Sequence, residues 1–341
     1  MSIVRYLIVD RYGSMIAKHS GRIRVVKGKE RLAEAPLLHL EAILVTTNGV
    51  AISSDAIREC TERGIPIYFL SGRGKPYASV YSQALTGTIA TRRAQLMAYE
   101  DERGVILAKR FVSGKLRNQA NLLRYMAKYR KEREPEIFDA IQILAPDILG
   151  MEAEIDGVEG KSVDEVREQL LNIEGRAAQS YWAGVQILLK ANLDWPGRRT
   201  RGASDPFNMT LNYAYGVLYG QIERALILAG LDPYAGFLHA DRPGKPSLSL
   251  DLIEEFRQQV VDRTMVGMVN KGVKIELDDS NHLTMEFRRR IAQAVMGRLE
   301  SRVPYEGKRF SLQSVIQSQA RHMATFLRGE RESYEPFVGS W

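Results

Sequence analysis

Residues 204–230 read SDPFNMTLNYAYGVLYGQIERALILAG and carry the start, the period and the stop of a helix. Asp205 is a preferred helix cap, Pro206 suits the first helical position, and Gly230 ends the pattern. Apolar residues recur between these limits with the 3.6-residue period of an α-helix, at positions 207, 211, 214, 215, 218, 222, 225, 226 and 229. The stretch therefore predicts a long core helix.

The chain before residue 89 has a different texture from the rest. Short β-branched or aromatic runs alternate there with glycine-containing turns, as in RYLIVD, MIAKH, RIRVV and IPIYFL. A short helix is expected over residues 54–63, and the loop SGRGKP follows the last of these runs. A meander or small sandwich is the simplest arrangement of such strands. From residue 89 onward the helical period dominates and strand signals are few.

These textures predict an α+β fold in which a small N-terminal β-rich domain precedes a larger all-α domain. We expect the first domain over residues 1–88, the all-α domain over residues 89–330 and a tail over residues 331–341. With 341 residues and 45% apolar composition, the chain is long enough to bury a substantial core, and its length favours two domains.

The chain carries no sign of secretion or of membrane insertion. Its single cysteine, Cys60, excludes an internal disulfide and a cysteine-cluster zinc site, and it suits a reducing compartment. Arg5 and Asp10 interrupt the N-terminus before any hydrophobic region long enough for a signal peptide. No apolar run approaches the roughly 18 residues of a membrane span. We expect a soluble cytoplasmic protein without a membrane partner.

Positive charge is concentrated in one part of the chain. The net charge of the whole chain is +7, but residues 103–133 alone hold ten Lys or Arg and one acidic residue, Glu132. Such a surplus favours a polyanion as partner, although a solvated helix face beside an acidic neighbour has the same composition. The residues of this run that we expect to contact DNA are Lys109, Arg110, Lys115, Arg117, Arg124 and Lys128.

One motif resembles a nucleotide-binding loop but lacks a residue that such a loop requires. Residues 157–162, GVEGKS, match the end of a P-loop, but the first glycine that the motif requires falls at Ile155. Binding of a nucleoside triphosphate by this route is therefore excluded.

Glu174 stands on the apolar face of a predicted helix. At 100° per residue it falls about 40° from Leu170. The same face carries Ile173, Ala177, Tyr181, Gly184, Val185 and Leu188. A carboxylate in a core costs several kcal/mol unless a cation, a hydrogen-bond cage or a raised pKa compensates for it. Two explanations stay open: a buried salt bridge to an arginine on another helix, or a metal-binding or catalytic carboxylate.

Residues 236–258, GFLHADRPGKPSLSLDLIEEFRQ, place a histidine shortly before an acidic helix. Asp251 and Glu254 are one helical turn apart and share a face, whereas Glu255 points further round. His239 follows the short, strand-like GFL, and the Pro- and Gly-containing loop after it turns the chain back toward the helix start. Taken alone, His239 is as well explained as a hydrogen-bonded structural residue, and Asp251 as a complement to the helix dipole.

Taken together, these residues have the composition of a divalent-metal site. Two carboxylates and one imidazole, without cysteine, favour Mg²⁺ or Mn²⁺ over structural zinc. Such an ion suits phosphoryl transfer, and in a strongly basic protein the expected phosphate substrate is nucleic acid. Arg257 lies one turn past Glu254 and is a candidate contact for a phosphate oxygen.

Four blocks of the chain carry a resemblance to a known family. They are IEGRAA (173–178), DPFNMTLNYAYGVLY (205–219), AGLDPYAGFLH (229–239) and GKPSLSLDLIEEFR (244–257). In order and spacing they resemble the CRISPR-associated integrases called Cas-one, and IPIYFLSGRGKPYA is similar to the β domain of that family. The resemblance implies that Glu174, His239 and Glu254 are catalytic and bind Mg²⁺ or Mn²⁺. Members differ in which acid of the last block binds metal, so Asp251 is a supporting candidate.

The resemblance also implies an activity and partners. We expect a homodimer, joined through its β-rich domain, that inserts spacer DNA into a CRISPR array together with the small protein Cas-two. The substrates are double-stranded DNA with 3′ ends, branched intermediates and the CRISPR repeat. A 3′ hydroxyl attacks a phosphodiester, and water in its place makes the protein an endonuclease.

The same residues leave two rival functions open. The first is a non-catalytic basic DNA-binding scaffold, in which Glu174 is buried in a salt bridge and His239 only packs a loop. The second is a metal-dependent hydrolase of small phosphate esters, which needs a deep pocket rather than a long basic surface.

Overall fold

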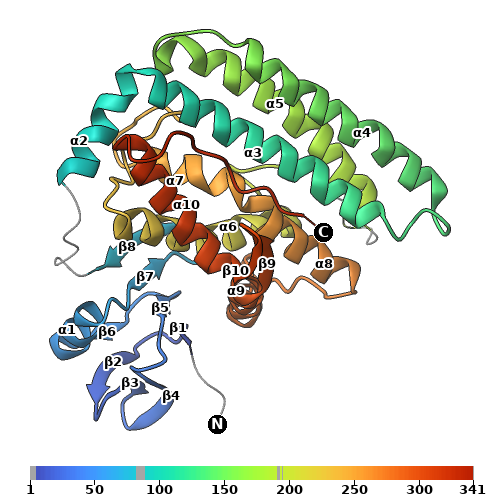
Figure 1. The fold of residues 1–341 in the computed structure, drawn as a ribbon. Coiled ribbons are helices and arrows are strands. Elements are labelled where there is room, and N and C mark those ends of the chain that lie inside the picture. Colours follow the sequence, from blue (N-terminus) through green and yellow to red (C-terminus); the bar gives the residue numbers. More distant parts are fainter. Residues whose placement is uncertain (1–4, 82–88, 190–192, 194, 341) are drawn as a thin grey trace.

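A computed structural model describes residues 5–81, 89–189, 193 and 195–340 of the chain (Figure 1). Strands dominate the N-terminal part and helices the remainder, so the predicted α+β fold is confirmed. None of the helices in these ranges is long and apolar enough to cross a membrane.

The N-terminal region contains two four-stranded sheets. The first has the order β1 (Tyr6–Val9), β5 (Ala42–Val45), β7 (Ile67–Leu70) and β8 (Pro76–Val80). The second has the order β4 (Glu30–Pro36), β3 (Arg22–Lys27), β2 (Met15–His19) and β6 (Ala51–Ile52). Helix α1 (Ser54–Glu62) lies where a short helix was predicted.

Strands β1, β2, β3 and β7 lie where the hydrophobic runs predicted them, whereas β4, β6 and β8 were not predicted, and the arrangement is not a simple meander. Strands β2, β3 and β4 follow one another as antiparallel neighbours, and so do β7 and β8. Strands β1, β5 and β7 pair in parallel, which requires crossover connections between them. The hydrophobic pattern of a strand reports burial and not the identity of its partner, so the pairing could not be predicted from it.

The first sheet is buried on both faces, which ties the two regions of the chain together. On one face Ile43 and Val45 pack in a cluster with the second sheet. On the other, Leu44 and Tyr68 join the core of the helical region. The predicted division at residue 88 falls in residues 82–88, which lie outside the described part of the chain, and it stays a prediction.

The helical region is built from long helices that share one core. Helices α3 (Glu102–Ala127), α4 (Pro135–Glu154) and α5 (Val163–Leu188) lie side by side along one side of the molecule (Figure 1). The others are α2 (Ile89–Met97), α6 (Pro206–Leu228), α7 (Ser247–Leu252), α8 (Arg263–Asn270), α9 (Met285–Glu300) and α10 (Leu312–Leu327). A hairpin of β9 (Arg302–Tyr305) and β10 (Lys308–Ser311) departs from the all-α prediction.

Helix α6 forms as its sequence predicts and anchors the first sheet. The side chain of Asp205 caps it by accepting the backbone N–H of Asn208. The loop that ends β7 passes so close to the helix that a Cβ atom on Gly216 would lie 1.6 Å from the carbonyl oxygen of Gly74. Glycine at 216 is therefore required where the SGRGKP loop crosses the helix.

Candidate active site

The stretch that follows His239 is a buried, irregular element rather than an amphipathic helix. The chain runs through α7, a 3₁₀ turn over Ile253–Glu255 and a π-helical turn over Gln258–Asp262. Almost every residue from 251 to 262 is buried, because α3, α6 and α9 all contact this segment. The strand expected at GFL is wrong: residues 236–239 form no strand and lie in a loop.

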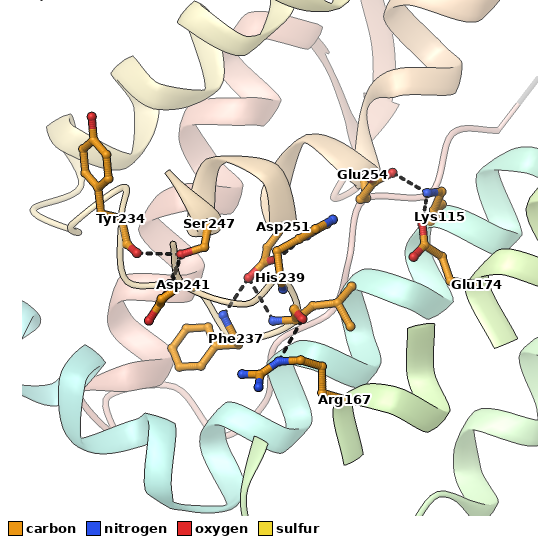
Figure 2. Close-up of polar contacts among 12 residues, drawn as sticks. Lys115, Arg167, Glu174, Tyr234, Phe237, His239, Asp241, Ser247, Asp251 and Glu254 are labelled. Carbon is orange, nitrogen blue, oxygen red and sulfur yellow. Dashed lines mark hydrogen bonds and ion pairs between the residues drawn. The ribbon is translucent and has the colours of Figure 1, made fainter. Parts of the chain in front are cut away.

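Asp251 holds this loop and the histidine in place. Its fully buried carboxylate accepts the backbone N–H groups of Phe237 at 2.7 Å, Leu238 at 3.1 Å and His239 at 2.9 Å. It also lies 2.7 Å from Nδ1 of the His239 ring (Figure 2). All four contacts use its oxygens, so Asp251 positions the loop and the ring of His239.

The contact with Asp251 fixes which nitrogen of His239 is available. A carboxylate offers only acceptors, so Nδ1 carries the proton and donates it, and Nε2 is the nitrogen that has the lone pair when the ring is neutral. Histidine ligands of metals ordinarily have this arrangement. Figure 2 shows the ring extending from Asp251 toward the side on which Glu254 and Lys115 lie.

Glu174 and Glu254 meet at a single cation, the ammonium of Lys115 on α3. Glu174, on α5, accepts a hydrogen bond from Nζ of Lys115, and Oε2 of Glu254 lies 2.8 Å from the same nitrogen as an ion pair (Figure 2). The side chain of Glu254 is 3% exposed and that of Lys115 is 9% exposed. The carboxylate on the apolar face is thus paired with a lysine, whereas the salt-bridge explanation had named an arginine.

The protonation of these groups follows from their pairing. Burial lowers the pKa of Lys115, but attraction to Glu174 and Glu254 outweighs that effect and raises it. Burial raises the pKa of Glu254, but Arg257, Lys115 and His239 together lower it well below its usual range. The carboxylate and the ammonium are therefore both charged near neutral pH.

The residues fit a hard divalent cation in their chemistry, although an ammonium lies between the carboxylates. Glu174 and Glu254 already converge on a positive ion, and the interaction of His239 with Glu254 places an imidazole on the same side. Over the described ranges, no three His, Cys, Asp or Glu side chains lie close enough to hold an ion together.

Arg257 borders the site as the sequence suggested. Its guanidinium lies 3.4 Å from Oε1 of Glu254 and over the ring of Tyr215, 5.0 Å from its centroid. Its Nε is buried without a hydrogen-bond partner among the described residues, which leaves a donor for a ligand oxygen. Arg198 lies over the same ring at 5.2 Å. Positive charge is thus gathered beside the carboxylates.

Tyr215 also belongs to a buried network that sequence reasoning missed. Its hydroxyl and that of Tyr181 both donate to Asp262, the latter over 2.6 Å. Burial raises the pKa of the Asp262 carboxyl to about 6, despite these two hydrogen bonds. The network joins α5 and α6 to the π-helical turn. Asp262 follows Val260 and Val261 but is itself followed by Arg263 and Thr264, so no sequence pattern marked it.

The C-terminal segment is docked on the element that carries Glu254. Glu255, the next residue, is fully buried and accepts hydrogen bonds from Tyr334 at 2.5 Å, Gln319 at 2.9 Å and the backbone N–H of Phe337 at 2.8 Å. The ring of Phe337 stacks on Phe256 with centroids 5.2 Å apart. The segment predicted as a tail over residues 331–341 therefore packs against the core as far as it is described.

We expect Tyr334→Phe to lower the free energy of unfolding by about 1–3 kcal/mol, because the buried carboxylate of Glu255 loses a donor. Urea unfolding of the variant and the wild type measures this difference. Tyr129→Phe is the matched control, since the Tyr129 side chain is 75% exposed. Equal unfolding free energies for Tyr334→Phe and the wild type would show that the segment contributes nothing through this contact.

The basic run over residues 103–133 is not one continuous exposed surface. Most of α3 is buried, since the helix packs against α4 and α5. Lys115 belongs to the carboxylate cluster, which corrects its expected place on a DNA-binding surface, and Arg110 pairs with Glu335 at 3.1 Å. Lys109 is half-buried, whereas Arg117, Arg124 and Lys128 are exposed. Spacings of seven and four residues place these three on one stripe of the helix.

Comparison with known proteins assigns the family. Residues 7–296 match the family model described as CRISPR associated protein Cas1, which is the Cas-one family. A protein from Archaeoglobus fulgidus named CRISPR-associated endonuclease Cas1 1 is 38% identical over 346 residues, covering 98% of this chain and 99% of its own.

Two solved structures share the fold. A casposase bound to its integration product has a TM-score of 0.82 at 24% identity, covering 97% of this chain and 93% of its own. A Cas6-RT-Cas1–Cas2 complex has a TM-score of 0.78 at 20% identity, covering 100% of this chain and 37% of its own. The match to the family model and the identity to the archaeal relative lead to one conclusion: the chain belongs to the Cas1 family.

Proposed function

We propose that this protein is a divalent-metal-dependent DNA endonuclease and integrase that inserts spacer DNA into a CRISPR array. The observation that carries the proposal is the convergence of Glu174 and Glu254 on one cation, beside a histidine whose ring is oriented by Asp251. This is the donor set of a Mg²⁺ or Mn²⁺ site in a family whose named members are endonucleases.

The partners in this proposal come from the names of similar proteins. A structural neighbour is a Cas1–Cas2 complex, and another is a casposase bound to an integration product. For this chain we infer a homodimer that acts with Cas2 on double-stranded DNA with 3′ ends, on branched intermediates and on the CRISPR repeat.

In the proposed reaction, a 3′ hydroxyl of the incoming DNA attacks a phosphorus atom of the repeat. The new oxygen–phosphorus bond forms as the bond to the leaving 3′ oxygen breaks, and water in place of the hydroxyl gives hydrolysis. A bound Mg²⁺ or Mn²⁺ supplies electrostatic stabilisation of the charge that develops on the phosphate and on the leaving oxygen.

The residues of the chain have separate tasks in this reaction. Glu174, Glu254 and Nε2 of His239 would hold the ion, and Asp251 accepts the proton on Nδ1 so that Nε2 stays available. Arg257 donates to an oxygen of the phosphodiester and fixes it next to the carboxylates.

The proposal is tested by strand transfer. Purified protein and Cas2 are incubated with a DNA duplex carrying 3′ hydroxyl ends and a CRISPR repeat, in Mn²⁺, in Mg²⁺ or in EDTA. We expect joined products only with a divalent ion, and nicking of branched DNA under the same conditions. Normal DNA binding without any product in either metal would overturn the proposal in favour of the scaffold.

Two hollows of the described surface give no support to the other rival function, a hydrolase of small phosphate esters. They are lined by residues of β3 and β4 and by residues of α6 and α10. Neither includes Glu174, His239 or Glu254, so neither offers a small phosphate ester a pocket at the carboxylates. A long DNA substrate needs no such pocket.

The exposed stripe of α3 gives a prediction for DNA binding. We expect Arg117→Glu with Arg124→Glu to reduce the slope of log affinity against log salt by about 2, since each phosphate contact contributes about one unit. Titrations of labelled duplex DNA at several salt concentrations measure this slope. Lys27→Glu with Lys29→Glu changes the charge equally on the exposed N-terminal region and is the control. If the slope is the same for both pairs, DNA runs along another surface.

A further inference from the structure

Lys115 is a buried cation at the point where three elements of the fold meet. It comes from α3, and its Nζ contacts Glu174 of α5 and Glu254 of the 3₁₀ turn (Figure 2). Lysine is almost never fully buried unless it is paired. Its neighbours on α3, Gly114 and Leu116, are buried without charge, so Lys115 brings the positive charge into this part of the helix.

The two carboxylates depend on this ammonium. Among the described residues, Glu174 forms an ion pair with no other cation, and Glu254 has only Arg257 besides, at the longer distance of 3.4 Å. Two carboxylates that converge on one point repel each other, and removal of one partner of a buried pair leaves an uncompensated charge. Loss of the ammonium therefore weakens the attraction that holds Glu174 and Glu254 together, although Arg257 still offsets part of their repulsion.

The position of this ammonium is also where a divalent ion would bind. Mg²⁺ requires oxygen ligands at about 2.0–2.1 Å in a nearly fixed geometry. A lysine ammonium and a divalent ion repel each other, and they cannot both use the same carboxylate oxygens at close range. One cation must therefore leave the carboxylates when the other arrives.

We propose that Lys115 is the built-in counter-ion of the metal site: its ammonium holds Glu174 and Glu254 together in the metal-free protein and gives way when a divalent ion binds. The inference rests on the proposed function, because it takes the two carboxylates as metal ligands. It adds that lysine and metal compete, so that the free protein keeps a formed site and metal affinity is lower than the carboxylates alone would give.

Thermal unfolding of Lys115→Met with and without Mn²⁺ tests this competition. In EDTA we expect the midpoint of the variant to lie about 5–10 °C below that of the wild type, because both carboxylates lose their counter-ion. Saturating Mn²⁺ should bring the two midpoints to within about 2 °C of each other, since the ion replaces the ammonium. Lys109→Met on the same helix controls for the loss of a lysine and should show no such rescue.

Mn²⁺ affinity is the second measurement, made by following the free ion with electron paramagnetic resonance. We expect Lys115→Met to bind Mn²⁺ at least about tenfold more tightly than the wild type, because no ammonium has to be displaced. If Lys115→Met does not fold, Lys115→Gln serves instead, since an amide keeps a donor to the carboxylates without the charge.

The outcomes separate this inference from the proposed function. Equal Mn²⁺ affinity in variant and wild type, with a loss of stability that Mn²⁺ does not restore, would overturn the counter-ion role and leave the metal site standing. If neither the wild type nor Lys115→Met binds Mn²⁺, both the counter-ion role and the proposed metal site are overturned. In Lys115→Met with Glu174→Gln, the stability lost in EDTA should be partly regained, because one of the two repelling charges is gone.

Discussion

Strand transfer by Glu174→Gln and by His239→Ala is expected to fall at least about 1,000-fold below the wild type, with DNA binding unchanged. Each substitution removes a ligand of the proposed ion, and loss of its electrostatic stabilisation is worth several kcal/mol in the transition state, at about 1.4 kcal/mol for each tenfold. The measurement is the initial rate of product formation in Mn²⁺, with DNA affinity measured in EDTA.

Glu168→Gln is the matched control for this experiment, because Glu168 is exposed on the same helix as Glu174. It removes an equal charge without touching the cluster, so the rate should stay within about twofold of the wild type. Wild-type rates in Glu174→Gln and His239→Ala, with normal DNA affinity, would place the reaction elsewhere on the molecule.

Asp251→Asn is expected to have the second largest effect, and it should act on both stability and metal binding. The carboxylate accepts three backbone N–H groups and the Nδ1 proton of His239, whereas an amide has one acceptor oxygen and presents its own donors to these groups. We expect a loss of at least about 3 kcal/mol in the free energy of unfolding, since each buried donor left unpaired costs about 1–3 kcal/mol.

The effect of Asp251→Asn on metal binding distinguishes positioning from general stability. With His239 no longer held in one tautomer, Mn²⁺ affinity should fall by about 10–100-fold. The affinity is measured well below the temperature at which the variant unfolds. Asp241→Asn changes a carboxylate of the same loop that accepts one hydrogen bond, from Ser247, and serves as the control. An unchanged Mn²⁺ affinity in folded Asp251→Asn would show that His239 needs no orientation to act.

Much of the site was accessible from sequence because its chemistry is unusual for its surroundings. Glu174 was identified by its place on an apolar helix face, which a single helical period reveals. His239 and Glu254 were predicted from the family resemblance, because their residue types alone left structural and functional roles open. The basic run was misjudged in part, because charge counted along a chain does not show which way each side chain points: Lys115 turned inward to the carboxylates, while Arg117 and Arg124 stayed on the surface.

Local sequence patterns were enough to predict several strands before residue 89, the long helices after it, and the capped core helix over Pro206–Leu228. These follow from periodicity, capping and turn residues, which act within a few residues of one another. Only the tertiary structure decided the parallel pairing of β1, β5 and β7, the docking of Tyr334 and Phe337 beside Glu255, and the role of Lys115. Each of these depends on contacts between residues far apart in the chain, which local patterns do not encode.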